Sequence, residues 1–166
     1  MPDPATQSSA AEAATTRPRE IAVIGGGAAG VLVASQLLRA GDGRLRPRVI
    51  EPRERLGEGI AYATRQPEHL LNVRAGNMAA FPDEPDGFTD FAARRTGAAD
   101  SPAQRYLPRA WYADYLRDTL ARFADPGSLH VRDAVVDIEG DGPFRVRLRS
   151  GQVLAADAVV IATGNA

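Results

Sequence analysis

Residues 25–30 of this chain read GGGAAG, and no other stretch limits the possible folds as strongly. The glycines at 25, 27 and 30 satisfy the pattern G-x-G-x-x-G, which is common when it stands alone. Its context here is specific, because an apolar run, Glu20–Ile24, precedes it and an amphipathic stretch, Ala28–Ala40, follows it. A strand that turns on glycines into a helix can hold a pyrophosphate on the free N–H groups of the helix start. The pattern therefore predicts a dinucleotide-binding strand, turn and helix.

A second strand is predicted over Arg48–Glu51, and it ends on an acid at the expected distance from the glycine turn. The carboxylate of Glu51 can accept hydrogen bonds from ribose hydroxyls, and its charge would repel a 2′-phosphate, which disfavours NADP. The alternative is a glycine turn without a ligand and a surface glutamate, but strand, helix, glycines and acid all occur together. The cofactor-binding residues expected from this unit are Gly25, Gly27, Ala28, Ala29, Gly30 and Glu51.

The rest of the chain predicts an ordered loop, two helices and a β-rich end. The middle, Pro52–Pro85, has little periodicity, but its apolar residues favour an ordered, functional loop. Helices are expected from Asp86 to near Gly97 and from Pro108 to about Ala124. Strands are expected over Leu129–Ile138, Phe144–Arg149, Val153–Leu154 and Ala158–Ile161.

Both FAD and NAD bind to such a glycine turn, and the β-rich end favours FAD. A simple doubly wound dehydrogenase would keep alternating strand and helix, whereas this chain inserts three short strands before its last buried strand. That order resembles the α/β, Rossmann-like FAD-binding domain of glutathione-reductase type, with a parallel sheet, helices and a three-stranded β-meander. The resemblance implies that Val135 meets the adenine, the alternative being an ordinary core position. It also places Thr163 and Gly164 near the dinucleotide.

Three further stretches are more specific, and they lie in the middle of the chain. They read GEGIAY at 57–62, LLNV at 70–73 followed by FPD at 81–83, and YLPR at 106–109. In order and wording they resemble the bacterial FAD/NAD(P)-binding family, a relative of the flavin-dependent N-hydroxylating monooxygenases, over nearly all of residues 20–166.

This resemblance implies that the middle loop passes beside the isoalloxazine ring, with Asn72 as a hydrogen-bonding partner; the alternative is a turn-stabilising asparagine. Arg109 would face the cofactor or a domain interface, the alternative being a surface arginine. Arg74 departs from the family, which often carries proline there; its charge could aid an anionic ligand, but we favour a solvated side chain.

Relatives of this kind usually carry a second dinucleotide domain for NAD(P)H and a C-terminal segment that completes the FAD domain. With one glycine fingerprint in 166 residues, the chain is expected to be the N-terminal part of such an enzyme. It would then be a truncated product or half of a split system, completed by a partner chain or by self-association. We expect residues 1–19 to be a disordered tail and residues 20–166 to be the FAD/NAD(P)-binding portion, with NAD(P)H needed only in a complete enzyme.

Composition excludes several function classes. The chain has no cysteine, so disulfides, thiolate metal sites and a redox dithiol are ruled out. Its two histidines, His69 and His130, are in no metal-ligand spacing, so no metal is expected. A net charge of -1 gives no reason to expect nucleic acid or a membrane as partner, and no secretory signal begins the chain, so the cytoplasm is expected by default.

The sequence thus predicts the FAD-binding portion of a flavin-dependent, NAD(P)H-using oxidoreductase, of the monooxygenase kind in its whole form, with catalytic residues unassigned. One alternative is a non-catalytic FAD or nucleotide-binding module, or half of a split enzyme. Another is a fragment of an NAD-binding dehydrogenase, which the meander disfavours.

Overall fold

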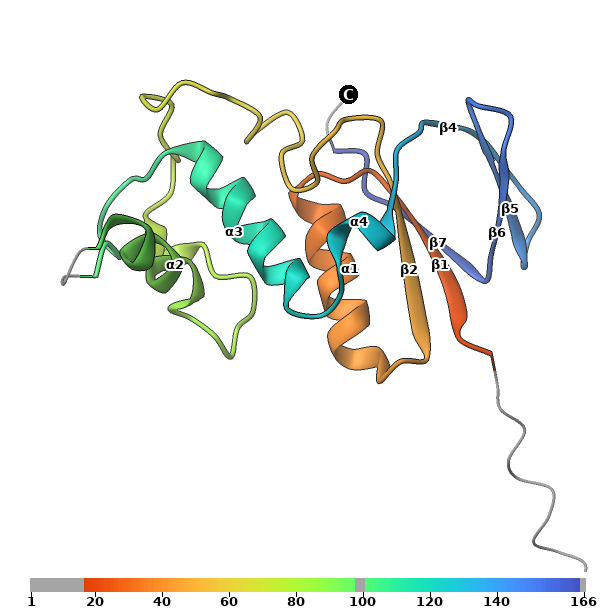
Figure 1. Cartoon of the computed structure of the whole chain (residues 1–166), viewed down its shortest axis with the longest axis horizontal. Helices are drawn as coiled ribbons and strands as arrows, with labels where there is room; N and C mark the ends of the chain where they lie inside the picture. The colour runs from red at the N-terminus through yellow and green to blue at the C-terminus, as the bar shows by residue number, and fades with distance from the viewer. Residues whose placement is uncertain (1–16, 98–100, 165–166) are drawn as a thin grey trace, which may run out of the picture.

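The computed structural model describes residues 17–97 and 101–164, which form two sheets and a set of helices. Four strands make a parallel sheet in the order β3-β2-β1-β7, and three make an antiparallel meander in the order β4-β5-β6. Figure 1 shows the helices on one side of the parallel sheet and the meander on the other. The elements are β1 (Arg19–Ile24), α1 (Ala28–Gly41), β2 (Leu45–Ile50), η2 (Ala75–Asn77), α2 (Gly87–Thr96), α3 (Arg109–Ala121), α4 (Pro126–Leu129), β3 (His130–Val131), β4 (Val135–Glu139), β5 (Phe144–Leu148), β6 (Val153–Ala156) and β7 (Ala158–Ile161).

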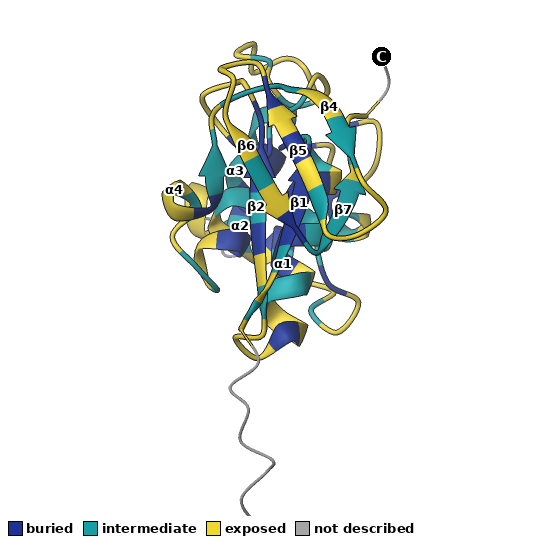
Figure 2. Cartoon of the chain, turned by 90° about the vertical axis from the view of Figure 1, so that its right-hand side faces the viewer, coloured by how far each residue is buried: buried dark blue, intermediate teal, exposed yellow. Residues whose placement is uncertain are grey.

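The parallel sheet is covered on both faces, so the apolar residues 21–24 of β1 are all buried. Successive side chains of a strand point to opposite faces. Along β1, Ile21 and Val23 join the core formed with the helices, whereas Ala22 and Ile24 join the core formed with the meander. Figure 2 shows these central strands as largely buried and much of the meander as exposed. The continuous apolar run before the glycine turn therefore reflects burial on two sides.

The predicted fold class, a parallel sheet with helices and a three-stranded meander, is confirmed. The prediction of one strand over Leu129–Ile138 is wrong, because this stretch is divided among α4, β3 and β4. β3 pairs with β2 in the parallel sheet, and β4 begins the meander. Asp133 stabilises the turn between them, since its carboxylate accepts hydrogen bonds from the N–H groups of Ala134 (2.7 Å) and Ser150 (3.3 Å). Hydrophobic periodicity does not reveal a change of sheet within one extended stretch.

The middle loop is ordered by backbone hydrogen bonds rather than by regular elements. Between β2 and α2 the chain contains only the short helix η2 and an isolated bridge between Leu70 and Pro108. The N–H groups of Leu71 and Ala75 donate to the carbonyl groups of Leu107 (2.8 Å) and Arg105 (2.9 Å). The loop therefore runs along the segment that leads into α3.

The ends of the chain add two findings. Residues 1–16 of the tail expected over residues 1–19 lie outside the described residues. Of the remainder, Arg17 forms an ion pair with Asp157 (2.6 Å), and Arg19 already begins β1. In residues 17–97 and 101–164, no helix combines the length and the apolar character that a membrane span requires.

Candidate functional site

The glycine turn joins β1 to α1, and close backbone contacts explain two of the three glycines of the G-x-G-x-x-G pattern. Gly25 has a φ of 103°, and a Cβ there would lie 2.4 Å from the carbonyl oxygen of Ala162. A Cβ on Gly30 would lie 1.9 Å from the carbonyl oxygen of Gly25, so α1 can approach the end of β1 only without a side chain here. At Gly27 a Cβ would stand 3.4 Å from the Cα of Gly59, so a second backbone segment approaches this glycine.

The N-terminus of α1 is open toward an anion. Gly27 is the N-cap residue and offers no side-chain cap, and the first turn carries no acidic residue. The first N–H groups of a helix have no acceptor within it, and their dipoles favour negative charge. Ala28 and Ala29 stand in this first turn, and Ala29 is exposed. These two predicted residues thus present backbone donors where a pyrophosphate could be held.

Glu51 lies directly after β2 and is hydrogen-bonded to the glycine turn. Its side chain is buried, and Oε2 accepts a hydrogen bond of 2.9 Å from the N–H of Gly26. Oε1 accepts from the backbone N–H of Arg53 at 3.0 Å and forms an ion pair with the Arg53 guanidinium at 3.4 Å. A carboxylate has about four acceptor positions. Within the described part of the chain, Oε2 therefore keeps one position for a further donor such as a ribose hydroxyl.

Gly26 is the residue of the turn whose role the motif does not predict. A Cβ at this position would lie 2.5 Å from Leu56 Cδ2 and 2.7 Å from Glu51 Cβ. The N–H of Gly57 donates to the Gly26 carbonyl group at 2.7 Å. Gly26 thus contacts both the acid and the segment that follows it. The signal in the sequence was the run of three glycines, since the pattern itself leaves the second position free.

The predicted turn Ala162-Thr163-Gly164 lies beside the glycine turn. The N–H of Ala162 donates to the carbonyl group of Ile24 at 2.8 Å, and the Ala162 carbonyl group faces Gly25. Thr163 and Gly164 follow it, exposed and next to the glycine turn in the chain path. The structure therefore brings together the glycine turn, Glu51 and the start of the Ala-Thr-Gly turn.

Two other predicted residues are not joined to this group by hydrogen bonds in the described part of the chain. Val135 is half-buried in β4 and packs against the core between the two sheets. Asn72 is exposed, and its side chain makes no hydrogen bond to another described residue. Arg74, the position that departs from the family, is exposed, and its guanidinium donates to Gln104 Oε1 at 2.8 Å. The described residues contain no group of three or more His, Asp or Glu side chains that could hold a metal ion.

A shallow groove lies where the chain continues beyond Gly59, the residue that approaches Gly27. It has a volume of about 430 Å³, and Ile60, the residue after Gly59, lies on its wall. Ile60 is 76% exposed and Leu70 is 45% exposed, so apolar side chains face solvent here. Arg109 lies at the same groove and donates from Nε to the Leu70 carbonyl group at 2.9 Å. The remaining lining residues are Ala61, Thr64 and His69.

Comparisons with known proteins agree with this geometry. A family model described as FAD-NAD(P)-binding matches residues 22–166. A flavin-containing monooxygenase from Stenotrophomonas maltophilia superposes with a TM-score of 0.61 at 25% identity, over 89% of this chain and 39% of that chain. A cyclohexanone monooxygenase mutant from Rhodococcus sp. Phi1, bound to NADP+, gives a TM-score of 0.63 at 20% identity, over 90% of this chain and 27% of that chain.

A third similar structure is the S-allyl-L-cysteine S-oxygenase from Allium sativum, with a TM-score of 0.60 and 21% identity over 89% of this chain and 36% of that chain. No curated protein sequence matches the chain. The chain thus spans between 27% and 39% of the length of these solved proteins.

Proposed function

Because the chain belongs to the FAD-NAD(P)-binding family, we propose that it binds FAD at the glycine turn. It would act as the FAD-binding portion of a flavin-dependent, NAD(P)H-using oxidoreductase of the monooxygenase kind. The observation that carries this proposal is the hydrogen bond of 2.9 Å from the Gly26 N–H to Glu51, which unites the phosphate-binding and ribose-binding parts of the site. When bound, the flavin supplies the redox chemistry, and the protein supplies position and electrostatics.

The residues at the turn fit the adenosine and pyrophosphate end of such a cofactor. The N–H groups of Ala28 and Ala29 would hold the pyrophosphate, since the N-terminus of α1 has no side-chain cap. The free acceptor position on Glu51 Oε2 would take a ribose hydroxyl, while its charge disfavours a 2′-phosphate. Thr163 and Gly164 would line the far side of the turn, next to Gly25. Glu51 and the helix start would therefore set where the dinucleotide lies.

Two observations support FAD over NAD as the ligand. The meander covers the face of the parallel sheet opposite the helices, which is the order that the FAD domains of flavoproteins show. The groove at Ile60 and Leu70, one residue beyond Gly59, offers exposed apolar side chains, which suits a flat aromatic ring. Asn72 and Val135 remain proposed contacts, to the ring and the adenine respectively.

A second candidate is an FAD-binding module that does not turn over by itself and works with a partner chain. The observation that favours it is that these 166 residues contain one G-x-G-x-x-G fingerprint, which would be used by FAD. In this case the glycine turn and Glu51 keep the same role, and the reductant would bind elsewhere.

The absorption spectrum of the purified chain tests both candidates. We expect a yellow protein, or one that becomes yellow with added FAD, and release of FAD on denaturation. A colourless protein that binds NAD but not FAD, measured by titration calorimetry with both ligands, would contradict the two proposals together. Anaerobic addition of NADH or NADPH then tests whether these residues also bind the reductant: bleaching of the flavin would show that they do, and an unchanged spectrum would place the reductant site outside them.

A further inference from the structure

The segment Arg55–Gly59 forms a cover over the glycine turn. The side chain of Leu56, which is 3% exposed, packs against Gly26, and the N–H of Gly57 donates to the Gly26 carbonyl group at 2.7 Å. The Cα of Gly59 lies next to Gly27. The segment therefore touches the two residues that precede the open end of α1, and its position decides how much space a dinucleotide finds there.

Helix α3 supports this segment from the opposite side. A Cβ on Gly57 would lie 3.0 Å from the carbonyl oxygen of Ala113, so the segment is packed between α3 and the glycine turn. Arg117 of α3 donates from Nη1 to the Leu56 carbonyl group at 3.1 Å. This is a hydrogen bond from a charged group to the backbone of the segment, and it fixes Leu56 directly before Gly57.

The guanidinium of Arg117 depends on a neighbouring carboxylate. Its side chain is only 20% exposed, and burial, together with the positive charge of Arg55, lowers the pKa of the Arg117 guanidinium. Asp114, one turn earlier on α3, forms an ion pair with Arg117. A partly buried charge is costly unless it is paired, so Arg117 needs Asp114 in order to stay at the Leu56 carbonyl group.

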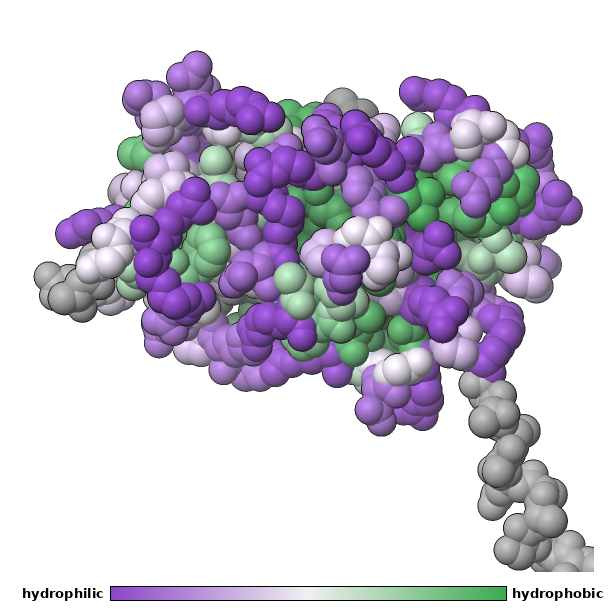
Figure 3. All heavy atoms as spheres, in the orientation of Figure 1, coloured by the Kyte–Doolittle hydropathy of each residue, from purple (hydrophilic) through white to green (hydrophobic). Residues whose placement is uncertain are grey.

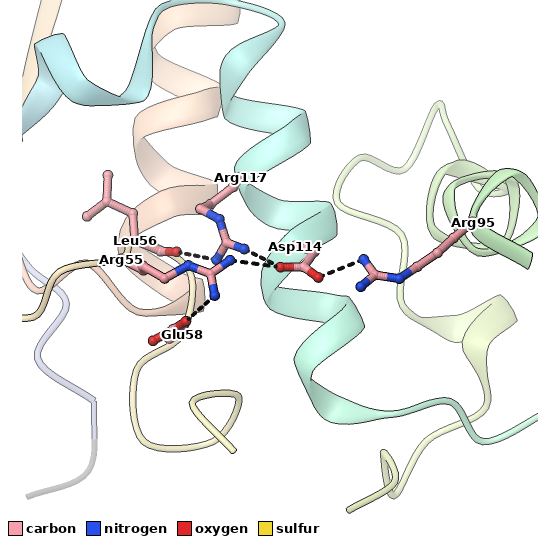
Figure 4. Close-up of polar contacts among 6 residues, drawn as sticks. All are labelled: Arg55, Leu56, Glu58, Arg95, Asp114 and Arg117. Atoms are coloured by element: carbon pink, nitrogen blue, oxygen red, sulfur yellow. Dashed lines mark hydrogen bonds and ion pairs between the residues drawn. The ribbon is translucent and has the colours of Figure 1, made fainter. Parts of the chain in front are cut away.

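Asp114 also joins the other charges around the segment. It pairs with Arg55 at 3.3 Å and with Arg95 of α2 at 2.7 Å, and Arg55 in turn pairs with Glu58 at 3.3 Å. Figure 4 shows Arg55 and Arg117 reaching Asp114 from one side and Arg95 from the other. Three arginines thus share one carboxylate, and without it they would repel one another. Hydrophilic residues cover most of the face in Figure 3, and within this cluster Arg117 and Asp114 are only 20% and 24% exposed.

We propose that Asp114 is a positioning residue for the cofactor site: through Arg117 and Arg55 it holds the segment Arg55–Gly59 against the glycine turn. It would shape the wall of the site without touching the dinucleotide. The inference rests on the proposed function, because it assigns the effect to FAD binding at that turn. The exposed pair of Asp118 with Arg94, at 4.0 Å on the same helix, has no such link and serves as the matched control.

The test compares Asp114→Asn with Asp118→Asn in two measurements. Asp114→Asn keeps the size of the side chain but removes its charge. We expect its Kd for FAD to rise about 10-fold, the effect of losing a hydrogen bond that involves a charged group. Asp118→Asn should stay within about twofold of the unmodified chain, as for other exposed pairs.

The second measurement is amide hydrogen exchange in the absence of FAD. The N–H of Gly57 is bonded to Gly26, so its exchange should accelerate in Asp114→Asn, while the amides in the middle of α1 stay protected. A merely structural role would lower the protection of α1 and Gly57 alike. Equal exchange at Gly57 in both variants, or an unchanged Kd for FAD in Asp114→Asn, would overturn the proposal.

Two further measurements cover the cases in which Asp114→Asn does not fold or the unmodified chain binds no FAD. If Asp114→Asn does not fold, Arg117→Gln is measured in the same way, since it removes the bond to Leu56 while leaving Asp114 paired with Arg55 and Arg95. If the unmodified chain binds no FAD, the proposed function fails, and exchange at Gly57 still decides whether Asp114 holds the segment in place.

Discussion

The close contact between Gly30 and Gly25 predicts that Gly30→Ala destabilises the protein, whereas helix propensity alone predicts that the substitution is stabilising. Gly30 lies in α1 with an ordinary helical backbone, so replacement by alanine should by propensity alone stabilise the helix by about 1 kcal/mol. In the structure, however, the added Cβ would lie 1.9 Å from the Gly25 carbonyl oxygen. Contact at a normal distance would require α1 to move by about 1.5 Å away from the end of β1.

Such a movement of α1 would lower the free energy of unfolding. Val31 and Ala34 of α1 are fully buried against the sheet, so a shifted helix loses packing there. Overpacking a core lowers the free energy of unfolding by about 1 to 3 kcal/mol. Because the obstacle here is backbone, we expect Gly30→Ala to lower it by about 3 kcal/mol. For a domain of this size that corresponds to a Tm lower by about 10 °C.

The assay is thermal unfolding followed by circular dichroism, with FAD titration as the second measurement. The control is Gly43→Ala, which adds the same methyl group where nothing lies within 4 Å and so reports only the strain of a positive φ. A Tm of Gly30→Ala equal to or above that of the unmodified chain would refute the reasoning, because it would mean that α1 does not pack this closely on the turn. We also expect FAD affinity to fall, since the displaced helix carries the N–H groups that we propose hold the pyrophosphate.

Three further outcomes follow from single side chains. Glu51→Gln removes the charge at the proposed ribose position and should weaken FAD binding about 10-fold in titration calorimetry; unchanged affinity would argue against that position. Burial raises the pKa of Tyr112 to about 12, so the folded state keeps this proton longer than the unfolded state. Stability should therefore decline as the pH rises from about 10 to about 12, and denaturant titrations of Tyr112→Phe should show a smaller decline. Hydrogen bonds from Arg17, followed by one from the Glu20 N–H, lower the pKa of Asp157 to about 2, so the stabilisation it gives is lost only as the pH falls toward 2. Carboxyl NMR of Arg17→Ala should show this pKa moved up, and an unmoved value would contradict the pairing.

Local patterns in the sequence were sufficient to predict most of the fold. The apolar run before the glycines, the helix after them and the acid at position 51 all depend on neighbours within one strand–helix–strand unit, whose chain order fixes its geometry. The meander was also predictable from its turn residues. Where prediction failed, at Leu129–Ile138, the stretch passes from one sheet to another, and its partners lie far away in the sequence.

The candidate site likewise has a part that the sequence predicts and a part that only the tertiary structure decides. The sequence by itself determined the glycine turn and Glu51, because the strand, the glycines, the helix and the acid form one short motif in the right context. Only the tertiary structure decided what surrounds them: that Gly26 must be glycine because Leu56 and Glu51 crowd it, and that α3 supports the segment over the turn. The physical reason is distance along the chain. Asp114 lies far from the glycine turn in sequence, and its connection to the turn runs through Arg117 and the Leu56 carbonyl group, contacts that exist only once α3 has packed against α1.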